Sequence, residues 1–203
     1  MNARFALIVA WLGAWLGAWL GALAGARPVQ AADVFMLDQR VGTIAFAVDH
    51  VGLFSSRGEF PLFQGRLLID RVHPEQTKIA VEVNAAAVTI PWPDGPDLLR
   101  GPDFFDTARH PIMRFTSTAI AGVDPRHFRI TGTLEIRGVQ QPLTMDATLE
   151  RQQADPISGT EMADFTVTGV LSRSSFGMTA QPVMISDRVK LHMTTRIELP
   201  RVR

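Results

Sequence analysis

Histidine, serine and carboxylate side chains are the groups of this chain that could do chemistry. The five histidines lie at positions 50, 73, 110, 127 and 192. No two of them are two or four residues apart, so none forms a local metal-binding pair. The sequence contains no GxSxG elbow, P-loop, dinucleotide fingerprint or HExxH motif. Cysteine and tyrosine are absent, which excludes thiolate nucleophiles and Cys-ligated zinc. We therefore predict that the chain is not an enzyme and has no catalytic residues, metal or cofactor.

Two polar features have both a functional and a structural interpretation. Asp103 and Asp106 could act as paired carboxylates, although short acidic side chains more often cap helical turns. His50 ends an apolar face and precedes Gly52. It could bind the polar head group of a ligand at the rim of a barrel, or it could be a buried histidine that a backbone carbonyl satisfies.

Apolar and polar residues alternate through most of the chain after Val34. In segment 188–199, Val189 and Leu191 share one face while Lys190 and His192 share the other. This alternation is typical of antiparallel strands with one buried and one wet face. Eight or nine such strands close into a barrel or pack as a sandwich. The expected strands are 34–37, 43–50, 58–69, 78–88, 112–120, 126–136, 142–150, 161–171 and 188–199.

Segment 91–111 interrupts this pattern with five prolines and no period of two. Residues 96–100 and 103–108 within it are expected to form short helical turns, with Asp97 and Asp103 as caps. We expect a long, partly helical connection across one end of the barrel. Long ordered connections in compact domains are often functional.

The first 31 residues have the pattern of an export signal. Arg4 precedes an apolar stretch over residues 5–26, and Val29-Gln30-Ala31 fits the small-x-small cleavage rule. We predict a signal peptide over residues 1–31 that is cleaved after Ala31, and a domain over residues 33–203 in the periplasm. Cleavage after residues 24–26 is an alternative. An uncleaved segment 5–26 is another, because it is long enough to anchor the protein in a membrane and could also mediate a homodimer.

The charge balance argues against nucleic acid as a partner. Twenty Lys and Arg residues balance twenty Asp and Glu residues. A neutral chain has no positive surface potential with which to recruit a polyanion. The length of 203 residues suits a single all-β domain.

Four motifs occur in order over nearly the whole chain after the signal. They lie at residues 50–65 (His-Val-Gly-Leu-Phe-Ser, Gly-Glu-Phe and Phe-Gln-Gly), 103–118 (Asp-Phe-Phe-Asp and His-Pro-Ile-Met-Arg-Phe), 132–143 and 175–189. Together these motifs resemble the YceI-like family. The resemblance implies a lipocalin-like, eight-stranded antiparallel β-barrel in the periplasm. It also implies that the barrel holds a polyisoprenoid or a similar, quinone-like amphiphile.

This resemblance makes a lipid carrier, store or stress-related binder the expected function. The alternatives are a structural partner of a membrane redox protein and, less favoured, an enzyme that acts on an isoprenoid lipid. Small and flexible residues on the inward faces, such as Ala147, Met145 and Met193, would leave room for a ligand. The candidate ligand-binding residues are His50, Phe54, Phe60, Phe104, Phe105, Phe115, Met145, Phe176 and Met193.

Overall fold

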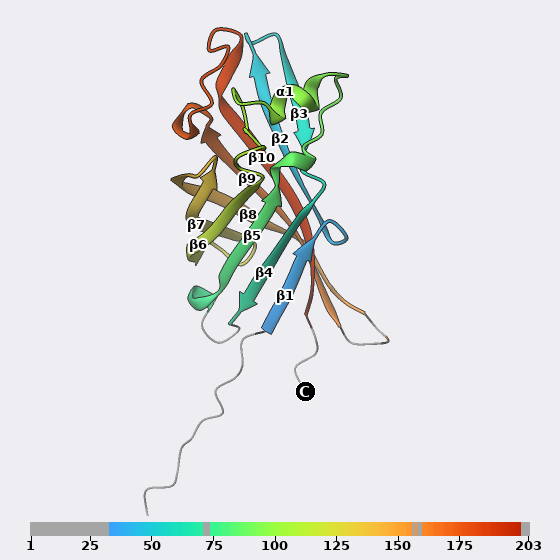
Figure 1. The fold of residues 1–203 in the computed structure, drawn as a ribbon. Coiled ribbons are helices and arrows are strands. Elements are labelled where there is room, and N and C mark those ends of the chain that lie inside the picture. The colour runs from blue at the N-terminus through green and yellow to red at the C-terminus, as the bar shows by residue number, and fades with distance from the viewer. Residues whose placement is uncertain (1–32, 71–73, 156, 158–159, 200–203) are drawn as a thin grey trace, which may run out of the picture. The chain divides into compact units, whose positions relative to one another are not determined.

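One antiparallel sheet of ten strands makes up most of the structure, a computed structural model that describes residues 33–70, 74–155, 157 and 160–199 (Figure 1). The order across the sheet is β1-β4-β5-β6-β7-β8-β9-β10-β2-β3. The predicted signal peptide lies outside the described residues. Among those that are described, no helix combines the length and hydropathy needed to cross a membrane. The strands are β1 (Asp33–Asp38), β2 (Gly42–His50), β3 (Phe54–Glu59), β4 (Phe63–Ile69), β5 (Lys78–Asn84), β6 (Ile112–Gly122), β7 (His127–Ile136), β8 (Val139–Ala154), β9 (Glu161–Ser172) and β10 (Ile185–Leu199).

Two three-residue links force the sheet to curl on itself. β1 and β2 occupy the first and ninth places in the strand order, yet only residues 39–41 join them. β3 and β4 occupy the last and second places, and only residues 60–62 join them. Four residue steps reach at most about 14 Å, so the two edges of the sheet must lie close together. The predicted lipocalin-like β-barrel is thereby confirmed, and the sandwich is excluded.

The sheet has ten strands where the sequence pattern predicted eight or nine. The pattern joined the last two residues of β3 and all of β4 into one strand, 58–69, and did not predict the start of β3. Pro61 interrupts this segment, because proline has no N–H to donate to a strand ladder. At this point the chain leaves β2, to which Phe60 N still donates a hydrogen bond at Ile44 O (2.9 Å), and crosses to the other edge.

The inward faces of the strands carry the residues that the alternation predicted. Ile44 and Phe46 of β2 and Val189 and Leu191 of β10 all face the interior. The interior contains two buried apolar clusters. One includes Phe46, Phe60, Val83, Ala85, Val88, Met113, Ile136, Phe176 and Met178, and the other includes Phe115, Ile130, Leu143, Met145 and Ala147.

The connection between β5 and β6 covers one end of the barrel, as expected. The two ends of this connection lie side by side, because Ala85 N donates a hydrogen bond to Pro111 O (2.8 Å). Helix α1 (Gly95–Arg100) lies within it, and turns at residues 102–105 and 107–109 occupy the second segment, 103–108, where a short helical turn was expected. Asp94 rather than Asp97 occupies the position before α1, without a side-chain cap bond. Reciprocal hydrogen bonds between Glu59 and Thr89 (2.9 Å each) attach the connection to β3.

Gly132 on β7 should be a sensitive position of the barrel wall, because an aromatic ring lies directly over it. A Cβ atom at Gly132 would lie 2.5 Å from Phe115 Cζ and 2.4 Å from Thr116 O. We expect Gly132→Ala to lower the free energy of unfolding by about 1–3 kcal/mol in urea denaturation. Gly122→Ala is the matched control, because nothing lies within 4 Å of its Cβ position. Equal stability of the two variants would contradict this packing.

Candidate ligand-binding cavity

A cavity of about 490 Å³ runs along the inside of the barrel. Its walls come from the inward residues of the strands, and its lining is almost entirely apolar. Both Thr43 and His50, at opposite ends of β2, line it. Seven residue steps along the strand separate them, so the cavity extends along about 24 Å of β2. A cavity of this length and polarity suits an extended apolar chain.

Seven of the nine candidate residues line this cavity. Phe54 and Phe176 do not. Phe176 is buried in the first apolar cluster, and Phe54 is 58% exposed at the end of the barrel, where it pairs with His50 across β3 and β2. The seven that line the cavity are His50, Phe60, Phe104, Phe105, Phe115, Met145 and Met193.

Phe105, in the connection between β5 and β6, closes part of the barrel interior at its covered end. Its ring packs edge-on against Phe60 (5.4 Å between centroids) and Phe46 (6.4 Å). The rings of Phe46 and Phe60 lie 5.3 Å apart. Arg137 Nη1 donates to Phe104 O (2.7 Å), which fixes the covering connection to the β7–β8 turn. Phe105 therefore belongs both to the core and to the cavity wall.

His50 is a buried polar group at the covered end of the cavity. Its Nε2 shares a hydrogen bond of 2.7 Å with Ser56 Oγ, so its partner is a side-chain hydroxyl rather than a backbone carbonyl. Phe54 stacks on the imidazole (4.7 Å between centroids, 10° between planes), and Trp92 lies 5.6 Å from it. These two rings cover His50 from the solvent side.

Arg173 is a second polar group at this end, and the sequence analysis did not identify it. It is buried and lines the cavity. The guanidinium donates to three backbone carbonyls, at Met178 (2.8 Å), Ile185 (2.9 Å) and Ser186 (3.1 Å). Ile185 is the cross-strand partner of His50, so the guanidinium lies beside the histidine. The sequence showed only an arginine among serines at the end of a strand, and its burial depends on the loop that folds over it.

Asp187 holds the turn that carries Arg173. Its Oδ1 accepts from Ser174 N (2.9 Å), its Oδ2 accepts from the Ser172 hydroxyl, and its backbone oxygen accepts from Arg173 N (2.9 Å). The Ser172 hydroxyl above all, with the Ser174 N–H and the charge of Arg173, lowers the pKa of Asp187 below its usual value. The carboxylate therefore stabilises the folded turn in its ionised form.

The other candidate chemical groups lie away from the cavity. Asp106 is buried in a turn with a positive φ of 50° and forms an ion pair with Arg109 (2.5 Å), while Asp103 is exposed. His127 pairs with Asp124 (2.8 Å) in the exposed β6–β7 turn. Across the part of the chain that the structure describes, no three His, Asp or Glu side chains are grouped to hold a metal ion.

Asp187→Asn should change how stability depends on pH. A carboxylate whose pKa is lower in the folded state stabilises the protein above its unfolded pKa of about 3.9, and this contribution disappears as the pH falls through the folded pKa. We expect the variant to be less stable at pH 7, with the difference from wild type shrinking between pH 5 and pH 2. Urea midpoints across this range measure the effect. Asp146→Asn controls for the loss of one negative charge, and a difference that stays constant with pH would contradict the expectation.

Comparison with known proteins agrees with this architecture. The model of the YceI-like domain matches residues 35–197. Protein YceI of Escherichia coli O157:H7 is 31% identical over 148 residues, which are 73% of this chain and 76% of that protein. The UPF0312 protein of Pseudomonas putida (strain W619) is 31% identical over 135 residues, 66% of this chain and 70% of that protein.

Solved structures share the fold at lower identity. BcnA of Burkholderia cenocepacia superposes with a TM-score of 0.70 at 19% identity, covering 79% of this chain and 99% of that one. A domain from Saccharophagus degradans, described as polyisoprenoid binding, gives a TM-score of 0.59 at 13% identity and covers 83% of this chain and 99% of that one. Motifs, barrel and family match thus agree, and the chain belongs to the YceI-like family.

Proposed function

We propose that this protein binds a long amphiphile, with the apolar chain in the barrel and the polar head group beside His50 and Arg173. The observation that carries this proposal is the cavity itself, about 490 Å³ with apolar walls and a polar cluster at its covered end. This volume lies within the range of small-molecule sites, roughly 300–1,000 Å³. Burying each methylene group contributes about 0.8 kcal/mol, so an extended chain binds with few polar contacts.

The polar end can recognise an oxygen-bearing head group. A guanidinium has five N–H donors, and Arg173 uses three of them on backbone carbonyls. His50 adds a ring nitrogen 2.7 Å from a hydroxyl that can itself donate or accept. A prenyl phosphate or the carbonyl of a quinone would accept hydrogen bonds here. The description of the Saccharophagus degradans domain as polyisoprenoid binding supports an isoprenoid chain, which both of these ligands can carry.

The physiological setting that we propose is the periplasm. Segment 1–31 has the pattern of an export signal, and the released barrel would act there as a carrier or store of its lipid. A chain of about 24 Å would lie shielded from water inside the barrel. This arrangement fits a binding protein better than an enzyme.

The enzyme alternative has one observation in its favour, the hydrogen bond between Ser56 Oγ and His50 Nε2 (2.7 Å). A serine nucleophile also needs a group that orients the histidine, in most cases a carboxylate. Within the described residues, no carboxylate hydrogen-bonds to the His50 ring. The pair therefore serves better as a head-group site than as a catalytic one.

Native mass spectrometry of protein purified gently from its own host tests the proposal directly. We expect a co-purifying apolar ligand, and we expect the emptied protein to bind a polyprenyl phosphate or a ubiquinone. Protein that is always empty and binds neither lipid would overturn the proposed function.

Ala147→Phe should block the cavity without unfolding the barrel. Ala147 is buried and lines the cavity, so a larger side chain there extends into empty space. Excluding even two methylene groups removes about 1.6 kcal/mol of binding, so we expect affinity for polyprenyl phosphate to fall at least about tenfold. Thr144→Phe is the matched control, because Thr144 is exposed on the same strand. If Ala147→Phe binds the lipid as tightly as wild type, the ligand does not occupy this part of the barrel.

A further inference from the structure

The hairpin between β2 and β3 carries an exposed apolar tip. Leu53 is 82% exposed, Phe54 58% and Val51 54%. The loop before β10 adds Val183, which is 81% exposed, and Met184, which is 54% exposed. None of these five residues lines the cavity. Phe54 covers the ring of His50, but neither the packing of the core nor the cavity accounts for the apolar character of the other four.

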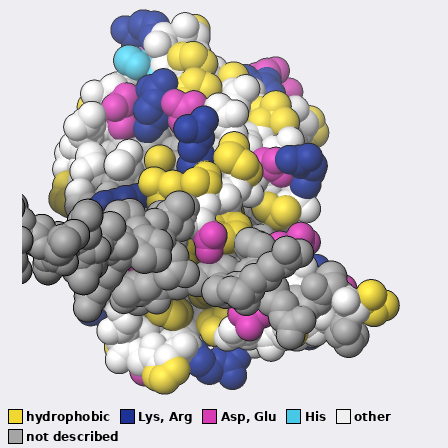
Figure 2. Space-filling view, turned by 90° about the horizontal axis from the view of Figure 1, so that it is seen from below, with side chains coloured by type: hydrophobic (Ala, Val, Ile, Leu, Met, Phe, Trp, Pro, Cys, Tyr) yellow, Lys and Arg dark blue, Asp and Glu magenta, His cyan; other side chains and the backbone are white. Residues whose placement is uncertain are grey.

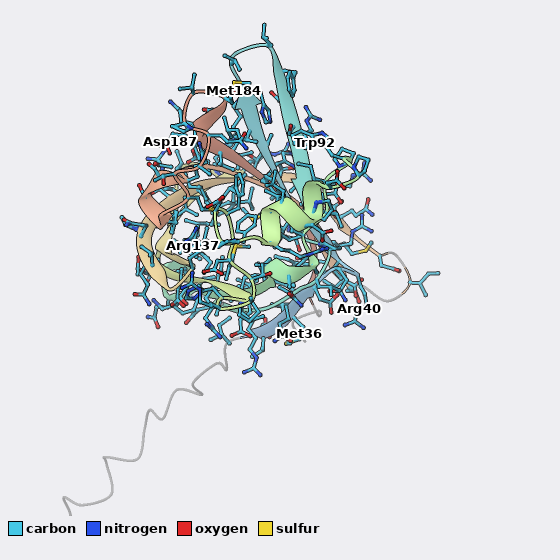
Figure 3. All side chains as sticks on the ribbon, turned by 45° about the horizontal axis from the view of Figure 1, so that its top comes forward. Met36, Arg40, Trp92, Arg137, Met184 and Asp187 are labelled. Carbon is cyan, nitrogen blue, oxygen red and sulfur yellow. The ribbon has the colours of Figure 1, made fainter. Side chains whose placement is uncertain are left out.

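These side chains form one surface around the covered end of the barrel. Ile185 pairs with His50 across β10 and β2, so Met184 and Val51 follow directly on neighbouring strands. Trp92 lies 5.6 Å from His50, and Figure 3 shows Trp92 and Met184 on either side of the hairpin. By contrast, the face seen from below in Figure 2 mixes charged and apolar side chains. We call the surface of Val51, Leu53, Phe54, Trp92, Val183 and Met184 the apolar rim.

The turn at the tip is made by a residue that disfavours it. Val51 and Gly52 have φ values of 49° and 71°, and Leu53 N donates to His50 O (2.8 Å). Asparagine is preferred at the first of these positions, and a β-branched residue is strained there. The β7–β8 turn has the same geometry, at 55° and 73°, with Arg137 in the first position. The valine at this position therefore costs stability. An apolar partner for its side chain would account for its presence here.

Charged side chains lie next to the apolar rim, on the side away from the hairpin tip. Asp49 and Lys190 form an ion pair (3.0 Å) across β2 and β10, and the Ser55 hydroxyl donates to Asp49. Arg57, Asp187 and Arg188 are also exposed at this level. The result is a protruding apolar tip above a band of three cations and two carboxylates. This order matches the change from acyl chains to head groups at a bilayer surface.

We propose that the apolar rim docks on a phospholipid bilayer and inserts its tip at the boundary between head groups and acyl chains. A specific protein interface uses about 20–30 residues a side, and a rim of six residues is too small for one. A narrow convex tip also suits a deformable partner better than a rigid one. None of the six residues of this docking surface belongs to segment 5–26.

The purpose of this docking rests on the proposed function, the binding of a lipid inside the barrel. His50, Trp92 and Ile185 line the cavity at the end where the rim lies. A lipid that leaves the bilayer chain-first would pass the rim and leave its head group beside Arg173. The rim would thus form the entrance, and the polar groups would hold the part of the ligand that stays nearest the membrane.

A site-specific fluorescent label tests the docking on the full chain. The chain has no cysteine, so Leu53→Cys and the control Val123→Cys each give a single site for an environment-sensitive fluorophore. Val123 is 60% exposed in the β6–β7 turn at the other end of the barrel. With phosphatidylcholine vesicles we expect the label at position 53 to brighten several-fold and shift to shorter wavelength, and the label at 123 to stay unchanged. Because the label reports its own position, attachment through segment 5–26 would not imitate this result.

Three outcomes would overturn the docking surface. They are no shift at position 53, an equal shift at both positions, and a shift at 53 that grows with protein concentration without vesicles. The last would identify the rim as an interface between copies of the chain.

Paired aspartates separate docking from ligand binding. We expect Leu53→Asp with Val183→Asp to slow the transfer of a fluorescent polyprenyl phosphate between phosphatidylcholine vesicles about tenfold or more, because two apolar side chains no longer enter the bilayer. Its affinity for the same lipid without vesicles should equal that of wild type. Val123→Asp with Ile157→Asp carries the same charge change as a control. An equal loss of affinity and transfer would place the rim in the ligand site and overturn docking. If wild type binds no lipid at all, the proposed function fails while the fluorescence result still decides the docking.

Discussion

The closure of one antiparallel sheet by two three-residue links is the constraint on which the rest of the structure depends. Residues 39–41 and 60–62 connect strands that lie at opposite ends of the strand order. Since such short links cannot span an open sheet, the inward faces of all ten strands meet around one interior. The alternating pattern then makes that interior apolar without any further requirement on the sequence.

Side chains fill only part of this interior. Glycine at position 132 leaves room for the ring of Phe115 over the wall, and Phe105 enters from the covering connection to pack on Phe46 and Phe60. Some of the room that small residues leave is therefore occupied by aromatic rings rather than by the cavity. What remains is the cavity, which is bordered by residues of both apolar clusters.

Polar recognition and the proposed contact with the membrane lie at one end of the barrel. Arg173 is buried without a carboxylate that ion-pairs with it among the described residues, and three backbone carbonyls hold its charge in place. Such a group is costly in an apolar wall unless its hydrogen bonds are satisfied. Asp187 keeps the turn in position from outside, and the apolar rim surrounds the same end. A ligand could therefore keep its head group near the bilayer while its chain fills the barrel.

The sequence by itself determined the strands, their inward faces and the family. The period of two predicted the faces of β2, β7, β8 and β10, because each alternate side chain of a strand must point to the same side. Motifs in order identified the family and with it the barrel. The sequence also placed His50 at the end of an inward face.

Only the tertiary structure decided which residues meet around the cavity. Phe54 and Phe176 belong to motifs as strong as those of Phe60 and Phe105, yet neither lines the cavity, because Phe54 is exposed in the apolar rim and Phe176 is buried in the core. Arg173 gained its place through carbonyls at residues 178, 185 and 186, and the apolar rim formed from segments over 130 residues apart. Alternation fixes the side of a strand on which a residue lies. The neighbours that it meets there depend on register and closure, which arise only when distant segments pair.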